Sequence, residues 1–189
     1  MSSAATNKQE IRRVVLDTRR HMTPMQRAVA SETITRRFLR SREFFAASTV
    51  ACFFPMADEV DTRAVFERCW RKAKRVFAPV LTRKHGMFFR EVLRETTLEK
   101  NEYGIWEPVD GATIDKRLLD IVVTPLVAAD ENGNRIGMGG GYFDRCFSYL
   151  RYRHVWRQPK LVALAFDCQK VEKITPNPWD IPLYRVYSE

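Results

Sequence analysis

The first forty residues show apolar positions at helical spacing. Apolar residues in the segment 11–18 follow the i, i+3, i+4, i+7 rule, which predicts a helix that Asn7 caps, with a glutamate three positions later. Thr23 has proline after it and glutamine three positions later, so it predicts a second capped helix that continues to about Leu39. The chain therefore opens with two helices.

Beyond residue 40 the pattern changes to short, continuous apolar runs. These runs predict strands at residues 48–54, 75–80, 87–92, 120–125 and 161–166. Helices are expected at residues 62–74 and 142–152, and residues 96–118 are expected to form an irregular functional loop. Continuous rather than alternating apolar runs are typical of a parallel sheet that is covered on both faces. We therefore predict a single α/β domain over residues 1–189, a three-layer sandwich with a mostly parallel central sheet and helices on both faces.

Length and cysteine content narrow the class of protein. A chain of 189 residues can bury a core without disulfides, and its four widely spaced cysteines form no CxxC pair. No apolar run approaches the roughly 20 residues of a membrane span. We expect a cytoplasmic protein with no membrane partner. The Ser-, Ala- and Arg-rich start is similar to an organellar transit peptide, so a mitochondrial location is the alternative, although Glu10 and Asp17 weigh against it.

The charge is strongly basic. Lys and Arg number 32 against 23 Asp and Glu, a formal net charge of +9, which favours polyanionic partners. No RNP, zinc-finger or helix-turn-helix signature accompanies the basic residues, so we expect no specific nucleic-acid partner, and we expect a monomer. A basic nucleic-acid-binding module stays a rival interpretation.

Glycine is concentrated in one segment. Residues 133–141, GNRIGMGGG, hold five of the eight glycines of the chain. Glycine permits positive φ and close backbone approach to a ligand, and a glycine-rich loop between a strand and a helix can cradle phosphate. We extend the expectation of positive φ to Gly140. The segment lacks both GxxxxGK[ST] and the third glycine of GxGxxG, so the residues alone leave anion binding and a tight structural turn both open.

The wider segment 124–145, TPLVAADENGNRIGMGGGYFDR, resembles the signature of the 5-formyltetrahydrofolate cyclo-ligase family. The resemblance also includes Lys8 and Arg12 near the start and three further segments, at residues 58–62, 104–108 and 161–180. Two departures are visible. Phe143 stands where the family usually has a second tyrosine, and Ala128-Ala129 replace a small residue followed by phenylalanine.

The resemblance implies an enzyme that uses ATP and Mg²⁺ to convert 5-formyltetrahydrofolate, usually polyglutamylated, to 5,10-methenyltetrahydrofolate. ATP phosphorylates the formyl oxygen, and nitrogen 10 then closes the ring. The implied catalytic residues are Arg135, Tyr142 and Asp144, and the implied magnesium ligands are Asp144 and Asp180. The implied ATP contacts are Lys8, Arg12, Arg135, Gly137, Met138, Gly139, Gly140, Gly141, Tyr142 and Arg145. The implied folate contacts are Phe54, Met56, Asp61, Trp106, Gly140 and Tyr142.

Each of these residue types also has a purely structural explanation. Lys8 and Arg12, one helical turn apart, can form a solvated helix face, and Asp144 can stabilise a helix start. Asp61 can cap a helix, and aromatic residues are more often core than ligand contacts. A sugar-phosphate isomerase-like enzyme is a second rival, since related α/β folds bind phosphosugars with glycine loops.

Overall fold

The protein is built on a seven-stranded sheet in the order β11-β10-β7-β1-β2-β3-β6. The computed structural model describes residues 2–153 and 158–189. In sheet order the strands are Arg185–Tyr187 (β11), Lys160–Leu164 (β10), Ile121–Val123 (β7), Thr49–Ala51 (β1), Arg75–Leu81 (β2), Met87–Glu91 (β3) and Thr113–Ile114 (β6). The first five strands run parallel, and β3 and β6 are antiparallel to their neighbours. The predicted mostly parallel sheet is confirmed.

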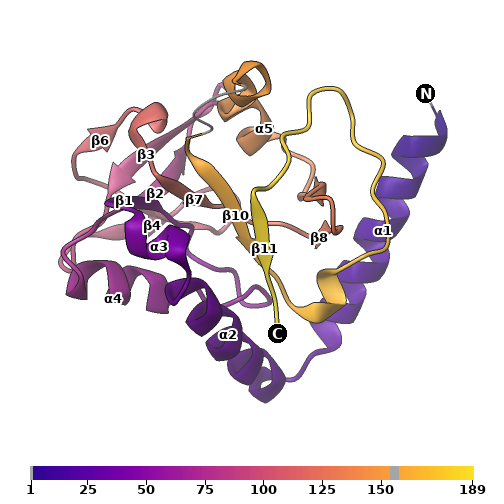
Figure 1. Ribbon diagram of the computed structural model, residues 1–189, viewed down its shortest axis with the longest axis horizontal. Coiled ribbons are helices and arrows are strands. Elements are labelled where there is room, and N and C mark those ends of the chain that lie inside the picture. Colours follow the sequence, from indigo (N-terminus) through magenta and orange to yellow (C-terminus); the bar gives the residue numbers. More distant parts are fainter. Residues whose placement is uncertain (1, 154–157) are drawn as a thin grey trace.

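Both faces of the sheet are covered. Three helices, α2 (Pro24–Leu39), α3 (Arg42–Ala46) and α4 (Arg63–Arg71), contribute to the core cluster on one face (Figure 1). The other face packs against the short helix α5 (Tyr142–Cys146) and the 3-10 helix η2 (Ser148–Tyr152). Each apolar run therefore sends alternate side chains into two separate cores, which confirms the predicted three-layer α/β fold.

Helix α1 (Ser2–His21) lies apart from these layers. It packs through Val15 against the small hairpin of β8 (Ala128–Ala129) and β9 (Arg135–Ile136), beside the sheet (Figure 1). This placement brings the first helix to the hairpin that leads into the glycine-rich segment.

Several predicted boundaries are wrong. Helix α1 begins at Ser2, because the small residues before Asn7 continue the helix, so Asn7 is not its cap. Helix α4 ends at Arg71, and the backbone turns at Ala73, which has φ +51°. The helix expected at residues 142–152 breaks at Phe147 into α5 and η2. The capping box of Thr23 at the start of α2 is confirmed.

The expectation that residues 96–118 form an irregular loop is wrong. The segment contains a second hairpin of β4 (Leu98–Lys100) and β5 (Trp106–Pro108), the sheet strand β6 and the 3-10 helix η1 (Lys116–Leu118). Among the described residues, no helix is both long and apolar enough to cross a membrane.

Candidate functional site

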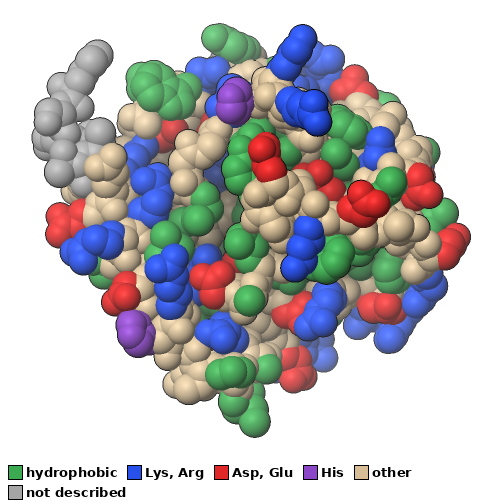
Figure 2. Space-filling view, turned by 180° about the vertical axis from the view of Figure 1, so that it is seen from behind, with side chains coloured by type: hydrophobic (Ala, Val, Ile, Leu, Met, Phe, Trp, Pro, Cys, Tyr) green, Lys and Arg blue, Asp and Glu red, His purple; other side chains and the backbone are tan. Residues whose placement is uncertain are grey.

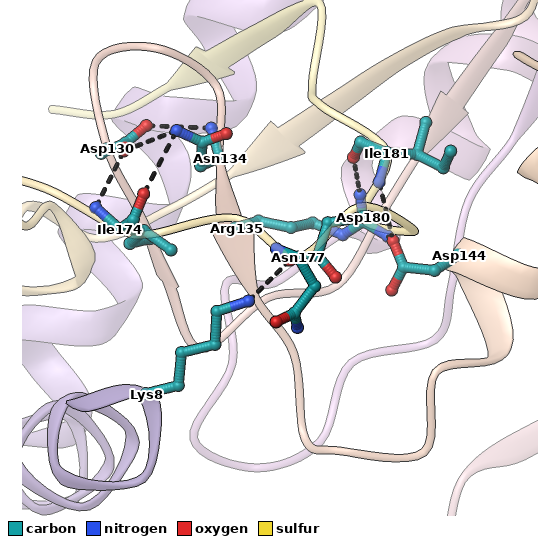
Figure 3. A network of polar contacts seen from close by, with 9 residues as sticks. All are labelled: Lys8, Asp130, Asn134, Arg135, Asp144, Ile174, Asn177, Asp180 and Ile181. Carbon is teal, nitrogen blue, oxygen red and sulfur yellow. Dashed lines mark hydrogen bonds and ion pairs between the residues drawn. The ribbon is translucent and has the colours of Figure 1, made fainter. Parts of the chain in front are cut away.

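A buried ion pair joins the glycine-rich segment to the helix that follows it. Arg135, from β9, has a side chain that is only 5% exposed and donates from Nη2 to Asp144 Oδ1 over 2.8 Å. Its Nη1 donates to the carbonyl oxygen of Ile181, and the amide of Ile181 donates to the same Asp144 oxygen over 3.1 Å (Figure 3). Burial lowers the pKa of Arg135, and the charges of Asp144 and Asp180 oppose that shift, so the guanidinium stays protonated.

A second carboxylate is held on the α1 side of this pair. Asp180 Oδ2 accepts from Lys8 Nζ over 2.6 Å and from the amide of Asn177 over 2.8 Å (Figure 3). The Lys8 side chain is 14% exposed, so it faces inward and does not belong to a solvated helix face. Helix α1 and the C-terminal segment thus meet at Asp180.

Each carboxylate keeps one oxygen without a partner. Within the described residues, Asp144 Oδ2 and Asp180 Oδ1 make no hydrogen bond or ion pair. No group of three or more His, Cys, Asp or Glu residues in that part of the chain is placed to hold a metal ion. Mg²⁺ commonly takes one or two protein carboxylates and completes its shell with phosphate oxygens and water. The donor set therefore fits magnesium bound together with a phosphorylated ligand.

The β8–β9 hairpin that carries Arg135 is braced by a buried carboxylate. Asp130 accepts hydrogen bonds from the amides of Asn132, Asn134 and Ile174 and from the Asn134 side chain, at 2.9 to 3.0 Å. Burial alone would raise the pKa of Asp130, but these hydrogen bonds outweigh it and lower the pKa. Gly133 at the turn has φ +80°, and a Cβ there would lie 2.5 Å from the Leu183 carbonyl oxygen. Gly133 is therefore a structural glycine.

The other four glycines, at 137, 139, 140 and 141, form what we call the glycine loop, residues 137–141. Gly139 and Gly141 have φ of +108° and +63°, a conformation that other residues rarely adopt, so the backbone explains why glycine occupies these two positions. Gly140 does not have positive φ, so that expectation is wrong; a Cβ there would instead lie 2.9 Å from the Tyr142 ring. A Cβ at Gly137 would meet no atom within 4 Å, and its φ is not positive. Neither packing nor backbone conformation requires glycine at 137, so the space beside it is open to a ligand.

Two of the predicted cations reach the loop from opposite ends. Arg12 of α1 donates from Nε to the Gly137 carbonyl oxygen over 2.9 Å. Arg145 donates from Nη2 to the Gly140 carbonyl oxygen over 2.7 Å and to the carbonyl oxygen of His85 over 3.3 Å. His85 lies in the turn after β2, so the Gly140 end of the loop lies at the carboxyl edge of the sheet, beside β2. Open α/β sheets bind ligands at this edge.

The far end of the loop meets the β4–β5 hairpin. The hydroxyls of Tyr142 and Tyr103 lie 3.3 Å apart, and Arg145 stacks 5.2 Å from the Tyr142 ring centroid. Hydrogen bonding to Tyr142 raises the pKa of Tyr103 to about 12, and the nearby charge of Glu102 adds to the shift. Trp106 on β5 is 43% exposed, with Lys100 over its ring.

The remaining predicted folate contacts follow β1. Phe54 stacks on Phe66 at 4.5 Å between ring centroids and so packs against the core, whereas Met56 is 40% exposed. Asp61 is paired through both oxygens with Arg63 and also accepts from the Arg63 amide over 3.0 Å. These bonds lower the pKa of Asp61. Thr62 is the N-cap residue of α4, so the alternative role of Asp61 as the helix cap is wrong, although its carboxylate does accept from the first amide of the helix.

The sequence interpretation overlooked Glu59, two residues before Asp61. Asp58 is paired with the buried Arg19 and Asp61 with Arg63, but Glu59 has no ion pair among the described residues. Its Oε2 accepts only from the Met56 amide, over 2.9 Å, and burial raises the pKa of Glu59. Perturbed carboxyl groups of this kind mark candidate functional sites. The sequence signal available was three acids in five residues with too few local cations to pair them all.

Comparison with known proteins decides the family. The model of the 5-formyltetrahydrofolate cyclo-ligase family matches residues 4–189. This chain belongs to that family. It is 35% identical over 185 residues to the 5-formyltetrahydrofolate cyclo-ligase of Haemophilus influenzae, an alignment that covers 95% of this chain and 96% of the relative. It is 37% identical over 174 residues to the Escherichia coli K12 cyclo-ligase, covering 90% and 93% of the two chains.

Solved structures agree with this family assignment. The 5,10-methenyltetrahydrofolate synthetase of Aquifex aeolicus superimposes with a TM-score of 0.81 at 28% identity and covers 95% of this chain and 88% of its own. The synthetase from Mycoplasma pneumoniae superimposes with a TM-score of 0.74 at 22% identity, covering 96% and 98%, which supports the fold. The cyclo-ligase family resemblance read from the motifs is confirmed.

Proposed function

We propose that this family member converts 5-formyltetrahydrofolate to 5,10-methenyltetrahydrofolate, consuming ATP with Mg²⁺ and releasing ADP and phosphate. The observation that carries the proposal is the pair of carboxylates, Asp144 and Asp180, each with one uncommitted oxygen beside an open glycine loop. A structural turn alone explains neither the open space at Gly137 nor the two unused oxygens.

The chemistry needs charge neutralisation and positioning more than acid–base groups. The formyl oxygen attacks the γ-phosphorus, and the bond between that phosphorus and the ADP oxygen breaks. Nitrogen 10 of the folate then attacks the activated carbon and gives up its proton to water, phosphate leaves with the former formyl oxygen, and the N5–C–N10 bridge closes. Magnesium, held by Asp144 and Asp180, would neutralise phosphate charge. The amides of the glycine loop provide further donors for phosphate oxygens.

Arg135 and Lys8 have a more specific part in this proposal than direct phosphate contact. Both Nη groups of Arg135 are already used, one by Asp144 and one by the Ile181 carbonyl, so Arg135 acts as a positioning residue that aims Asp144. Lys8 is an ammonium with freely rotating donors. It can leave Asp180 for a phosphate oxygen when the metal arrives.

On the folate side we propose that Glu59 binds the N–H groups of the pterin ring. Asp61 would first have to break its paired bonds to Arg63, whereas Glu59 has an unused oxygen beside exposed Met56. Glu59→Gln should raise the KM for folate more than Asp61→Asn does. An equal or larger effect of Asp61→Asn would return the role to Asp61.

The decisive assay combines purified protein, 5-formyltetrahydrofolate, ATP and Mg²⁺. Near-ultraviolet absorbance follows the methenyl product while a coupled assay follows ADP. Product should require all three reactants, with one ADP per product molecule. Full-rate product formation without ATP would refute the proposal.

The net charge of +9 suggests the form of the folate. Lys and Arg side chains are spread over the face shown in Figure 2, among acidic ones, and do not form one stripe.

We propose that the protein acts as a monomer on polyglutamylated folate and binds no specific nucleic acid. Pentaglutamyl substrate should show a lower KM than monoglutamyl substrate, and salt should reduce the difference. Equal KM values at every ionic strength would contradict tail binding, and nanomolar, sequence-selective oligonucleotide binding would support the rival.

A further inference from the structure

Trp179 is a large aromatic side chain that the fold leaves exposed. It is 58% exposed, and among the described residues no ring or cation contacts it. The described tryptophans Trp70 and Trp106 differ, since each carries a cation over its ring. Burial of a tryptophan ring is strongly favourable, so a ring left in water beside a functional site points to a ligand that covers it.

The backbone around Trp179 is held by several hydrogen bonds, whereas its side chain is exposed. Asn177 and Asp180 close a turn through two hydrogen bonds, the amide of Asp180 to the Asn177 carbonyl and the amide of Asn177 to the Asp180 carboxylate. Ile181 is tied to Asp144 and Arg135, and Arg151 donates to the Pro178 carbonyl oxygen over 3.4 Å. The ring is therefore presented from a rigid turn, immediately before a candidate magnesium ligand.

The two ends of the glycine loop differ in their surroundings. At the Gly137 end lies Arg12, one helical turn along α1 from Lys8, and Lys8 is bonded to Asp180 in the turn that carries Trp179. The same turn is also tied to α5, through the bond from the Ile181 amide to Asp144. At the Tyr142 end lie the turns that carry His85 and Tyr103. In the proposed reaction the γ-phosphate must face the folate. If the folate lies at the Tyr142 end, the remainder of the nucleotide extends toward the Gly137 end.

We propose that Trp179 is the stacking platform for the purine base of the nucleotide. The inference rests on the proposed function, because it takes the glycine loop as the site of the triphosphate. It adds a residue that distinguishes ATP from a bare polyphosphate. Base stacking on an aromatic ring is sequence-tolerant, so Trp179 accepts adenine or guanine by its π face and leaves base selection to other groups.

The test is calorimetric binding of two probes, ATP and inorganic tripolyphosphate, each with Mg²⁺. Wild type should bind ATP more tightly than tripolyphosphate. Trp179→Ala should weaken ATP binding by about tenfold, the size of a lost base–aromatic stack, and should leave tripolyphosphate binding unchanged. Trp179→Phe should restore most of the difference. Titration of wild type with ATP should also quench tryptophan fluorescence, and Trp179→Phe should remove that quenching.

Tyr184→Ala is the matched control, because it removes an exposed aromatic ring just before β11, outside the proposed site, and should leave ATP affinity unchanged. Unchanged ATP affinity in Trp179→Ala would overturn the inference, and so would equal losses for both probes, which would show that Trp179 acts only through the turn that holds Asp180. Either result leaves the proposed reaction standing. Failure of wild type to bind ATP at all would instead refute the proposed function.

Discussion

The two walls of the site, the carboxylate pair and the glycine loop, differ in how their polar groups are satisfied. Arg135, Asp144 and Asp180 come from three different segments and are largely buried. Asp144 is bonded to Arg135 and Asp180 to Lys8, and these bonds use one oxygen of each carboxylate (Figure 3). The glycine loop is more exposed. Met138 within it is 61% exposed, and Arg12 and Arg145 contact it through the carbonyl oxygens of Gly137 and Gly140.

This difference indicates a division of labour. Carboxylates that hydrogen bonds already hold in position can bind a metal ion with little reorganisation. Preorganised electrostatic groups contribute to the reaction rate in this way. A wall of exposed amides without side chains can instead approach a phosphate closely. Changes in the first wall should therefore reduce turnover, and changes in the second should mainly weaken ATP binding.

The largest effect is expected at the carboxylate wall. Asp144→Asn keeps an oxygen for Arg135 and the Ile181 amide but removes the charge, so kcat should fall at least about 100-fold, the loss seen when one key electrostatic contact is deleted. Asp167→Asn, which removes an exposed carboxylate paired with Lys170, should leave kcat unchanged. Both are measured by methenyl formation at saturating ATP and folate. A near-normal kcat in Asp144→Asn would show that Asp144 only stabilises the start of α5.

The same contrast between paired and unpaired groups occurs on the folate side. Asp58 and Asp61 are held by ion pairs, whereas Glu59 has none among the described residues. Glu59→Gln should raise the folate KM by about tenfold or more, since a hydrogen bond to a charged group is worth roughly 1.5–3 kcal/mol. Because burial raises the pKa of folded Glu59 above its ordinary value of 4.5, the native state binds this proton more tightly than the unfolded chain. The stability contribution of Glu59 is therefore fully present below pH 4.5 and is lost as pH rises through its folded pKa.

Thermal unfolding tests the sign of that linkage. At neutral pH, Glu59→Gln should unfold at a higher temperature than wild type, and the gain should shrink as pH approaches 4.5. Asp61→Asn is the matched variant, because the pKa of Asp61 is lowered, so its loss should destabilise the protein at neutral pH. A Glu59→Gln protein that is less stable at neutral pH would show that its carboxylate is satisfied within the fold.

A smaller effect separates the two kinds of glycine. Gly137→Ala places a methyl group in open space, so the Tm should not change while the KM for ATP rises about tenfold through loss of close approach. Gly133→Ala should do the reverse, because its Cβ would collide with the Leu183 carbonyl and its φ is +80°, a backbone strain of about 1–3 kcal/mol. Unaltered ATP binding in Gly137→Ala would make the loop a structural turn.

The smallest effect is expected at the Tyr142 end of the loop. Tyr142→Phe removes the hydroxyl that contacts Tyr103 but keeps the ring under Arg145 and against Gly140. An exposed hydrogen bond between two hydroxyls contributes about 1 kcal/mol or less, so the folate KM should rise only about threefold, with kcat nearly constant. A loss of kcat comparable with that of Asp144→Asn would place Tyr142 in the chemical step.

The layers of the fold follow from local patterns, because continuous apolar runs and capping residues act over a few positions. The break at Phe147 and the early start of α1 do not follow, because both depend on weak preferences that packing can override. The motif residues Lys8, Asp144 and Asp180 do meet at one place in the structure, as the family resemblance implies. The ion pair of Lys8 and Asp180 does not follow from the sequence, since the two residues lie 172 positions apart.

Choosing between neighbouring acids was also beyond the sequence. Asp61 and Glu59 are both carboxylates in one short segment. Only the structure shows that Asp61 forms an ion pair with Arg63 and that burial raises the pKa of Glu59. Gly140 is a similar case, because the sequence marks a cluster of glycines without indicating which member has positive φ. The extent of the domain over residues 1–189 stays a prediction.

The central claim, that carboxylates hold the metal while the glycine loop holds phosphate, is tested most directly by the affinity for ATP with and without Mg²⁺. Calorimetric titrations would compare wild type with Asp144→Asn and Gly137→Ala. Without the metal, the carboxylates should repel the triphosphate. We predict that Mg²⁺ tightens ATP binding in wild type and in Gly137→Ala but much less in Asp144→Asn, and that Gly137→Ala binds ATP more weakly under both conditions. Equal enhancement by Mg²⁺ in all three proteins would contradict the account.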